Sequence, residues 1–303
     1  MQNMKRRGAL LATTSALALT LAACSSGEAD EAGGTASGPD GAEPITIGVH
    51  SGWEEGIAVS YLWEHILTEA GYEVELETAD AGVVFTGLAQ GDYDVNFDTW
   101  LPLTHASYLE QYGDDLEELG MWLEEAPLTI AVNEDAPIDS LDELAENADL
   151  FGNRIVGIES GAGLTKQVQD EVIPTYGLED MEFAISSTPA MLAELEAATD
   201  AGENIAVTLW EPHWAYDAYP IKNLEDPEGA LGEPDDIFTY GTKGFSEEYP
   251  EVAEMIGSFT MEADQLHSLE NLMFNKNGGE DPAASVDAWL EENPDVLSEL
   301  GVA

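Results

Sequence analysis

Short apolar or alternating runs follow one another along this chain, separated by segments of helical spacing. Strands are expected at residues 45–49, 72–77, 93–97, 129–132, 155–158, 183–186 and 205–209. Helices are expected at residues 57–70, 83–90, 104–111, 165–172 and 189–198, and over most of the tail from residue 248. Strands that alternate with helices are typical of an α/β fold with mostly parallel sheets.

Several helix ends carry local signals. Gly71 and Gly91 are expected to stop the first two helices, because glycine accepts the left-handed backbone that ends a helix. Ser140 followed by Glu143 is typical of a capping box, in which a serine opens a helix and the glutamate occupies its N3 position. A further helix is therefore expected to start at residue 141.

Cys24 is the only cysteine of the chain and follows an apolar run at residues 9–21. Lys5, Arg6 and Arg7 precede that run, and a basic start followed by an apolar stretch is typical of a secretory signal. The run is shorter than the ~20 apolar residues that span a bilayer. A cysteine after small residues resembles a bacterial lipobox, in which the thiol is acylated. The alternative is an ordinary signal peptide with a chance cysteine.

These patterns predict a lipoprotein signal peptide at residues 1–23 and an acylated Cys24. Residues 25–43 contain no aromatic or branched apolar residue and read as a flexible tether. The chain is therefore expected on the outer face of the cell membrane, held by a lipid anchor. The folded part starts near Pro44, and its roughly 260 residues exceed the usual single core, which favours two lobes.

The charge of the chain is strongly negative. It has 8 Lys and Arg against 62 Asp and Glu, which gives a formal net charge of −54. Nucleic acids and anionic lipid surfaces are excluded as partners, because phosphate binding needs a basic patch. The acids are spread along the whole chain, which favours solvation in a saline habitat, where screening reduces self-repulsion. An acidic surface that attracts the ligand is the alternative.

No catalytic, metal or cofactor site is expected. The acidic alternation at residues 92–98 resembles the start of a calcium loop, but Phe97 and Leu103 stand where that loop needs glycine and glutamate. The glycines at residues 160–163 lack the lysine of a phosphate-binding loop. The five histidines lack zinc-site spacing, and there is no nucleophile elbow.

Three tryptophans stand at the ends of expected strands. Trp53 follows the first strand, Trp100 follows residues 93–97, and Trp210 follows residues 205–209. Ligands of open α/β sheets bind beyond the carboxyl ends of the strands, and indole faces attract a cation that cannot donate hydrogen bonds, such as a quaternary ammonium. Any one of these tryptophans could instead serve core packing, but the three together favour one aromatic cage. The tryptophans expected to serve packing are Trp63, Trp122 and Trp289.

Six segments together resemble the glycine betaine substrate-binding proteins of ATP-driven importers. They are GWEEGIA (52–58), VFTGLAQGDYDV (84–95), WLPLTH (100–105), GIESGAG (157–163), SSTPAM (186–191) and TLWEPHW (208–214). The resemblance implies a two-lobed periplasmic-binding-protein fold of type II with the ligand cleft between the lobes. It implies lobe one at residues 44–130 plus 239–303 and lobe two at 134–238, with crossing strands near 128–132 and 238–242.

The resemblance also implies the roles of the site residues. Trp53, Trp100 and Trp210 match cage positions, and the amides of Gly56 and Ile57 match a carboxylate-binding turn that opens a helix. Secondary candidates are Glu55, at a position where choline-binding relatives carry an acid, and His213, Trp214 and Met261. Met261 stands where many relatives place another cage tryptophan.

The implied function is capture of a small quaternary ammonium ligand by lobe closure and its delivery to the permease subunit of an ABC importer, without catalysis. Glycine betaine, proline betaine, carnitine and choline stay open as ligands. Two other classes are kept: a secreted hydrolase using a carboxylate with His213 or His105, and an adhesion module with its tryptophans on one exposed patch.

Overall fold

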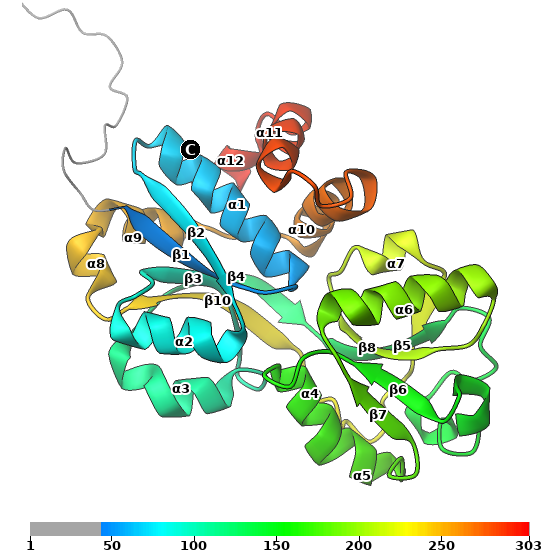
Figure 1. Cartoon of the computed structure of the whole chain (residues 1–303). Coiled ribbons are helices and arrows are strands. Elements are labelled where there is room, and N and C mark those ends of the chain that lie inside the picture. Colours follow the sequence, from blue (N-terminus) through cyan, green and yellow to red (C-terminus); the bar gives the residue numbers. More distant parts are fainter. Residues whose placement is uncertain (1–43, 303) are drawn as a thin grey trace, which may run out of the picture. The chain divides into compact units, whose positions relative to one another are not determined.

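A computed structural model describes residues 44–302. The predicted signal peptide, Cys24 and the tether at 25–43 lie outside the described residues. Two five-stranded sheets organise the described part, and helices surround both (Figure 1). We call the sheet that contains the first strand sheet A, and the other sheet B.

Sheet A has the strand order β2-β1-β3-β10-β4. Its strands are β1 (Ile45–His50), β2 (Val74–Ala79), β3 (Val95–Leu101), β4 (Leu116–Ala126) and β10 (Asp235–Thr242). The pairs of β1 with β2 and with β3 are parallel, whereas β10 runs antiparallel to β3 and β4. Ile45, Ile47 and Val49 of β1 are buried in the core, as expected of a central strand.

Sheet B has the order β7-β6-β8-β5-β9. Its strands are β5 (Leu128–Asn133), β6 (Arg154–Gly157), β7 (Glu182–Ile185), β8 (Ala206–Trp210) and β9 (Ile221–Asn223). The pairs of β6 with β7 and with β8 are parallel, and β5 runs antiparallel to β8 and β9. The carboxyl ends of β6 and β8 therefore lie at the same edge of sheet B.

The helices follow the expected spacing with small shifts at their ends. They are α1 (Glu54–Glu69), α2 (Ala81–Gln90), α3 (Ala106–Tyr112), α4 (Gly163–Gln167), α5 (Ile173–Tyr176), α6 (Thr188–Ala201), α7 (Ala215–Ala218), α8 (Phe245–Glu248), α9 (Pro250–Ser258), α10 (Ala263–Glu270), α11 (Pro282–Glu292) and α12 (Val296–Glu299). Gly91 ends α2 with φ 74°, as expected. The predicted helix at 165–172 is α4 followed by a π-helical turn, Val168–Val172.

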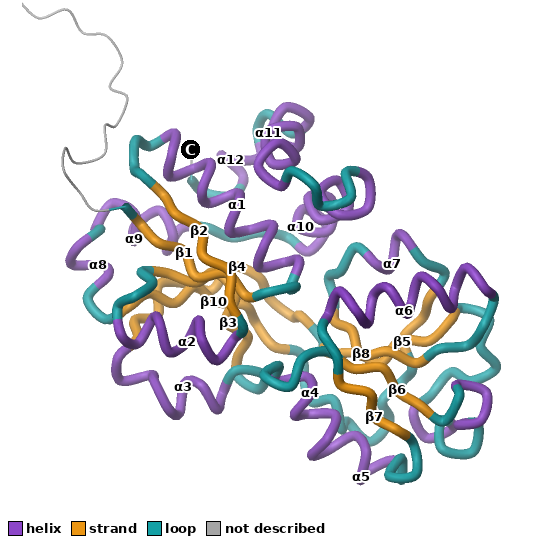
Figure 2. Tube along the Cα trace, viewed as in Figure 1, coloured by secondary structure: helices purple, strands orange, loops and turns teal. Residues whose placement is uncertain are grey.

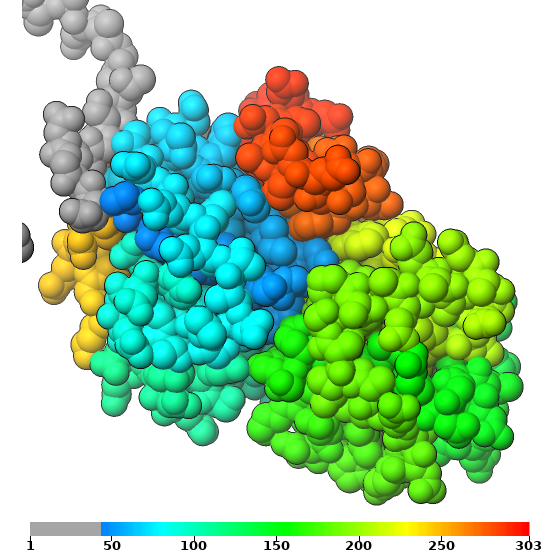
Figure 3. All heavy atoms as spheres, viewed as in Figure 1, coloured from blue at the N-terminus to red at the C-terminus, as the bar shows by residue number. Residues whose placement is uncertain are grey.

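The carboxyl-terminal helices pack on the amino-terminal half of the chain. Helices α10 and α11 lie against α1 (Figure 2). In the space-filling view, the orange surface around α10 meets the yellow-green surface around α7 (Figure 3), and there His267 of α10 forms an ion pair with Asp217 of α7 at 2.9 Å. The tail therefore belongs with sheet A and also touches the elements of sheet B.

The expectation of mostly parallel sheets is half correct. Four strand pairs are parallel and four are antiparallel among the described residues. The antiparallel pairs all involve β5 or β10, the strands with which the chain enters one sheet after leaving the other. A strand that arrives from the other sheet needs no helical crossover, so it is free to run against its neighbours.

The chain crosses between the sheets at slightly different residues than expected. β4 ends at Ala126 and β5 starts at Leu128, and the return runs between Asn223 and Asp235. Residues 128–130, expected in lobe one, therefore pair in sheet B, and residues 235–238, expected in lobe two, pair in sheet A. We use lobe one for sheet A with its helices and lobe two for sheet B with its helices.

The capped helix expected at residue 141 is a single 3-10 turn, Leu141–Glu143. Ser140 does not cap it, because its hydroxyl donates to the carbonyl of Glu225 at 3.3 Å. The Glu143 carboxylate accepts from the amide of Asp139 at 3.0 Å. A bridge between Ser140 and Glu225 holds this segment, so a tertiary contact replaces the local cap.

Candidate functional site

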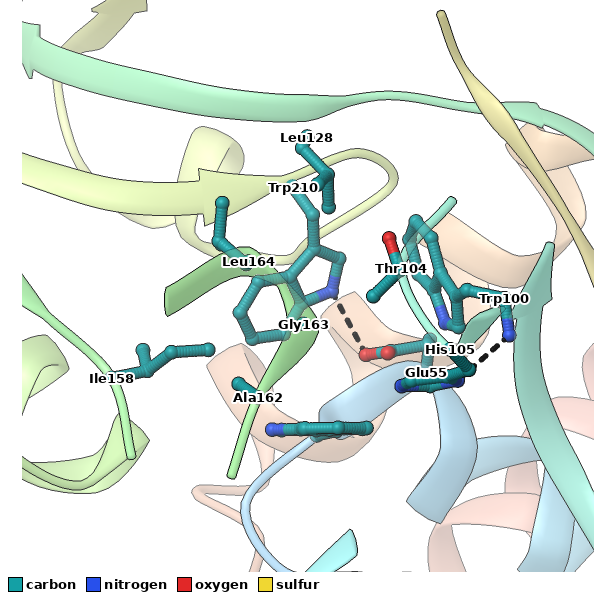
Figure 4. Close-up of a pocket in the computed structure, with 11 residues that line it drawn as sticks. Glu55, Trp100, Thr104, His105, Leu128, Ile158, Ala162, Gly163, Leu164 and Trp210 are labelled. Carbon is teal, nitrogen blue, oxygen red and sulfur yellow. Dashed lines mark hydrogen bonds between the residues drawn. The ribbon is translucent and has the colours of Figure 1, made fainter. Parts of the chain in front are cut away.

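One pocket is lined by residues of both lobes. It encloses about 290 Å³ of space between side chains, part of it open to solvent. Its lining residues are Trp53, Glu55, Trp100, Thr104, His105, Leu128, Ile158, Ala162, Gly163, Leu164 and Trp210. In Figure 4, Ile158 and Leu164 of lobe two lie on one side of Trp210, and Trp100 and Thr104 of lobe one lie on the other.

The three tryptophans at strand ends meet in this pocket. Trp53 is the residue before α1, directly after β1; Trp100 lies in β3; and Trp210 is the last residue of β8. All three are at least 95% buried. The sequence-based expectation that they converge on one site therefore agrees with the structure, and the exposed patch of an adhesion module does not.

Each indole N–H of these tryptophans donates to a carboxylate. Trp100 donates to Asp98 at 2.7 Å within lobe one. Trp210 donates to Glu55 at 2.9 Å, as Figure 4 shows, and this bond joins lobe two to lobe one. Trp53 donates to Glu159 of lobe two at 2.5 Å. The N–H edge of each ring is thus engaged within the protein.

His105 lines the pocket and was considered from the sequence only as part of a hydrolase. Its ring stacks on Trp53 with centroids 5.4 Å apart and an interplanar angle of 9°. Its Nδ1 accepts from the Trp100 amide at 2.9 Å, so the ring proton of neutral His105 is on Nε2. Nε2 is buried and has no hydrogen-bond partner among the described residues. The pocket wall therefore holds one buried N–H donor.

Burial keeps His105 in this neutral form. Removal from water lowers the pKa of His105 well below its usual value, and the neighbouring His50 lowers it further. Burial also lowers the pKa of His50 to about 3, against the opposing hydrogen bond to Asp98. Both rings are uncharged at neutral pH, so neither places a positive charge beside a bound cation.

Four carboxyl groups are buried at this end of the two lobes, and one of them, Glu55, lines the pocket. Glu54, Glu55, Asp98 and Glu270 are each at most 7% exposed. Burial raises the pKa of Glu55 well above its usual value, and the nearby charges of Asp98 and Glu270 raise it further. Burial raises the pKa of Asp98 to about 7, although the bond from Trp100 opposes this shift. Protons therefore occupy part of this cluster at neutral pH.

Residues 43–292 match the family described as the substrate binding domain of an ABC-type glycine betaine transport system. The chain belongs to this family. Its two sheets, each with its helices, form the two lobes of an α/β periplasmic-binding-protein fold, as the sequence predicted.

Individual relatives agree with the family. The chain is 32% identical over 165 residues to the glycine betaine/carnitine transport binding protein GbuC of Listeria monocytogenes. That alignment covers 54% of this chain and 53% of GbuC, so the match spans about half the length of this relative. The glycine betaine, L-proline-binding protein ProX of Borrelia burgdorferi has a TM-score of 0.78 and 26% identity, over 86% of this chain and 97% of ProX.

A choline-binding protein of an ABC transporter, solved with choline, is also similar. Its TM-score is 0.74 and its identity 25%, over 85% of this chain and 93% of that protein. The proteins similar to this chain thus include ones named for glycine betaine, a zwitterion, and one solved with choline, a cationic alcohol.

The turn at Gly56 and Ile57, matched to the carboxylate-binding turn of the family, does not line the pocket. The Ile57 amide donates to the Trp53 carbonyl at 3.0 Å, because it closes the first turn of α1. Gly56 packs so closely on Asp98 that an added Cβ would lie 2.3 Å from its Oδ2. In this arrangement the Ile57 amide is engaged by the helix itself, so its assignment as an anion donor stays a prediction.

The secondary candidates divide into one that lines the pocket and three that do not. Glu55 lines it. Met261 is buried in the core of lobe one, where its amide donates to the Trp122 carbonyl at 2.8 Å, so it forms no wall of this pocket. His213 is buried behind Trp210, with Nε2 3.3 Å from Glu54, and Trp214 stacks on it at 5.7 Å. These two residues support the pocket from outside.

The structure has two further features relevant to function. Within residues 44–302, no group of three or more His, Cys, Asp or Glu side chains has the arrangement of a metal site. In the same residues, no helix combines the length and the apolar character that a membrane crossing requires.

Proposed function

We propose that this protein captures glycine betaine, or a closely related quaternary ammonium osmoprotectant, and delivers it to the permease of an ABC importer. The observation that carries the proposal is the convergence of Trp53, Trp100 and Trp210 on one pocket between the lobes. Membership in the glycine betaine family and the similarity to GbuC support this ligand class.

The tryptophan faces serve the cationic end of the ligand. A trimethylammonium group donates no hydrogen bonds, so an aromatic wall stabilises it without leaving an N–H unsatisfied. Each face contributes roughly 0.5–2 kcal/mol. With hydrogen bonds to the carboxylate at roughly 1.5–3 kcal/mol, the sum is compatible with micromolar binding at roughly −8 kcal/mol.

His105 serves the carboxylate end. Its Nε2–H is a buried donor without a hydrogen-bond partner in residues 44–302, and a buried unsatisfied donor costs free energy that a ligand oxygen recovers. The Thr104 hydroxyl is already engaged, because it donates to Asp235 at 2.5 Å. Burial raises the pKa of Glu55 well above its usual value, which favours its neutral form and reduces its repulsion of a ligand carboxylate.

Choline is the second candidate ligand, and Glu55 favours it. A carboxyl group in the pocket wall, engaged by Trp210 on one oxygen, suits a cationic alcohol when it is ionised. Carnitine and proline betaine share the quaternary nitrogen and the carboxylate. Parallel titrations with these four ligands, followed by tryptophan fluorescence, rank them directly.

Replacement of a cage tryptophan by leucine is expected to weaken glycine betaine binding about 2- to 30-fold for each of Trp53, Trp100 and Trp210. Leucine keeps apolar bulk but removes the π face, at a cost of roughly 0.5–2 kcal/mol. Phenylalanine is expected to cost less. Isothermal titration calorimetry measures the change, and the control is Trp289→Leu, in the core of lobe one away from the pocket.

The ligand series decides the cage assignment. Glycine betaine is expected to bind more tightly than its dimethyl and unmethylated relatives, because the ammonium of glycine loses hydrogen bonds to water that the cage does not replace. Equal affinity for glycine and glycine betaine would refute the cage, whatever the tryptophan variants show.

We propose that binding is not followed by catalysis. The family of transport substrate-binding domains supports this, and so does the neutral His105, whose Nδ1 is occupied by the Trp100 amide. The hydrolase alternative predicts turnover of a betaine ester by the purified protein, which a product assay detects.

We further propose an acylated Cys24 that holds the protein on the extracytoplasmic face of the cell membrane. Cys24→Ala is expected to release the protein from the membrane fraction or to leave it unprocessed, since the thiol is the acceptor of the lipid. Cell fractionation with immunoblotting measures this. A variant that stays both processed and membrane-bound argues against the lipid anchor.

The acidic composition fits a saline habitat. The 62 Asp and Glu are spread along the chain, and screening shortens the range of their mutual repulsion when salt is high.

A further inference from the structure

Glu159 lies outside the pocket lining but touches one of its walls. It follows β6 in lobe two, and its Oε1 accepts from the indole nitrogen of Trp53 in lobe one at 2.5 Å. Its other oxygen, Oε2, accepts from the amide and the hydroxyl of Thr188, both at 3.1 Å. Thr188 is the first residue of α6. One carboxylate thus joins the start of a lobe-two helix to a wall supplied by lobe one.

A second bond between the lobes runs in the opposite direction. Trp210 of lobe two donates to Glu55 of lobe one at 2.9 Å, and both side chains are buried. Each lobe therefore supplies one tryptophan that donates to the other lobe and one glutamate that accepts from it. Lobe one supplies Trp53 and Glu55, and lobe two supplies Trp210 and Glu159. Trp100 differs, because its acceptor Asp98 lies in its own lobe.

These two indole bonds between the lobes exist only when the lobes meet. When the lobes separate, Trp53 loses Glu159 and Trp210 loses Glu55, whereas Trp100 keeps Asp98. Two of the three cage rings then lose the contact that fixes the ring edge. The orientation of these rings is therefore coupled to closure, and a bond from an indole N–H to a carboxylate, such as that from Trp53 to Glu159, is among the stronger hydrogen bonds.

We propose that Glu159 is a positioning residue that orients the Trp53 wall in the closed form and thereby slows ligand release, with Glu55 as its counterpart for Trp210. This inference rests on the proposed ligand site. Glu159 does not touch the ligand; it acts through Trp53. Because the bond forms as the lobes come together, after the ligand has met the open site, its loss affects dissociation more than association.

Stopped-flow tryptophan fluorescence with glycine betaine tests this on the purified protein. Glu159→Ala is expected to raise the dissociation rate constant about 10-fold, the scale of a hydrogen bond to a charged group, and to change the association rate constant less than about 2-fold. Glu159→Gln keeps one carbonyl acceptor and is expected to show a smaller increase. The matched control is Glu143→Ala, whose carboxylate accepts from the amide of Asp139 in its own lobe.

A double-mutant cycle separates positioning from general destabilisation. Trp53→Phe keeps a ring but has no indole N–H, so Glu159→Ala is expected to add nothing in that background. Full additivity of the two changes overturns the inference, and so does a Glu159→Ala variant with an unchanged dissociation rate. If Glu159→Ala does not fold by circular dichroism, Glu159→Gln and Thr188→Val supply the same comparison.

The failure of this inference differs from the failure of the ligand site. If the wild type binds glycine betaine and Trp100→Leu weakens binding, the site stands, and unchanged kinetics in Glu159→Ala contradict only the positioning role. If Trp100→Leu binds like the wild type, the site itself is wrong and the inference falls with it.

Discussion

Gly163→Ala is expected to weaken ligand binding roughly 10- to 100-fold, because the added methyl group collides with the opposite lobe. A Cβ at position 163 would lie 2.0 Å from the Thr104 carbonyl oxygen and 2.7 Å from its carbonyl carbon. Gly163 opens α4 in lobe two, whereas Thr104 belongs to the turn after β3 in lobe one. The variant must therefore hold the lobes apart at the pocket.

The Thr104 backbone, which the added methyl group would meet, is held in place by hydrogen bonds. Asp235 accepts from the amide of Leu103 at 2.6 Å and from the amide of Thr104 at 2.9 Å. The clash is thus with a backbone that is held in place, and relief has to come from opening of the lobes. Calorimetry gives the affinity, and small-angle X-ray scattering shows whether saturating glycine betaine still compacts the variant.

Gly161→Ala is the matched control in the same loop. Its Cβ would lie 3.7 Å from the Tyr108 hydroxyl, an ordinary contact, so wild-type affinity is expected. Wild-type affinity in Gly163→Ala as well would mean that ligand binding does not require the contact seen between the lobes.

Asp98→Asn is expected to increase the free energy of unfolding by up to about 4 kcal/mol at pH 8 and to change it little at pH 4. Burial raises the pKa of Asp98 from 3.8 to about 7, and one pKa unit corresponds to about 1.4 kcal/mol. Asparagine keeps the oxygen that accepts from Trp100. Its amide group takes the place of Oδ2, which has no hydrogen-bond partner among the described residues.

The direction follows from proton binding. Between about pH 4 and pH 7 the folded state holds a proton on Asp98 that the unfolded state has released, so the stability of the wild type falls as pH rises through this range. Above about pH 7 both states are ionised and the difference stays constant. The shifts of His50 and His105 have the opposite sign, but they are present in both proteins and cancel in the comparison.

Urea unfolding at several pH values from 4 to 8 measures this difference. Asp92→Asn, at an exposed site on lobe one, is the control and is expected to follow the wild type at every pH. A difference between Asp98→Asn and the wild type that does not grow with pH would show that Asp98 is ionised in the folded protein at low pH.

The sequence predicted the fold where local signals were strong. Glycines marked helix ends such as Gly91, and the strands at 45–49 and 205–209 were visible as apolar runs. The long strand β4 (Leu116–Ala126) was missed, because its glutamates and leucines are spaced more like a helix than a strand. Pairing with β10 determines its conformation, and such a tertiary pairing leaves no local signal.

The sequence predicted the tryptophan walls of the candidate site but not the hydrogen bonds that hold them. Trp53, Trp100 and Trp210 were identifiable because each is a large aromatic residue directly at the end of an expected strand, where ligands of α/β sheets bind. Glu159 lies 106 residues from the Trp53 that it contacts, and nothing in a sequence with 62 acids distinguishes this one. Met261 was proposed from its place in a family motif, but the chain folds it into the core.

In the proposed closure of the lobes, lobe two meets lobe one at the turn that Asp235 holds. Gly163 reaches the Thr104 carbonyl with no room for even a methyl group, so rotation of lobe two ends on backbone. The smallest separation of the lobes is then set by this backbone contact and does not depend on the ligand in the pocket. A ligand that fits within this gap permits full rotation, and a bulkier one leaves a residual angle. In the proposed importer, the angle between the two lobes would thus carry the size of the ligand to a partner that does not touch the ligand.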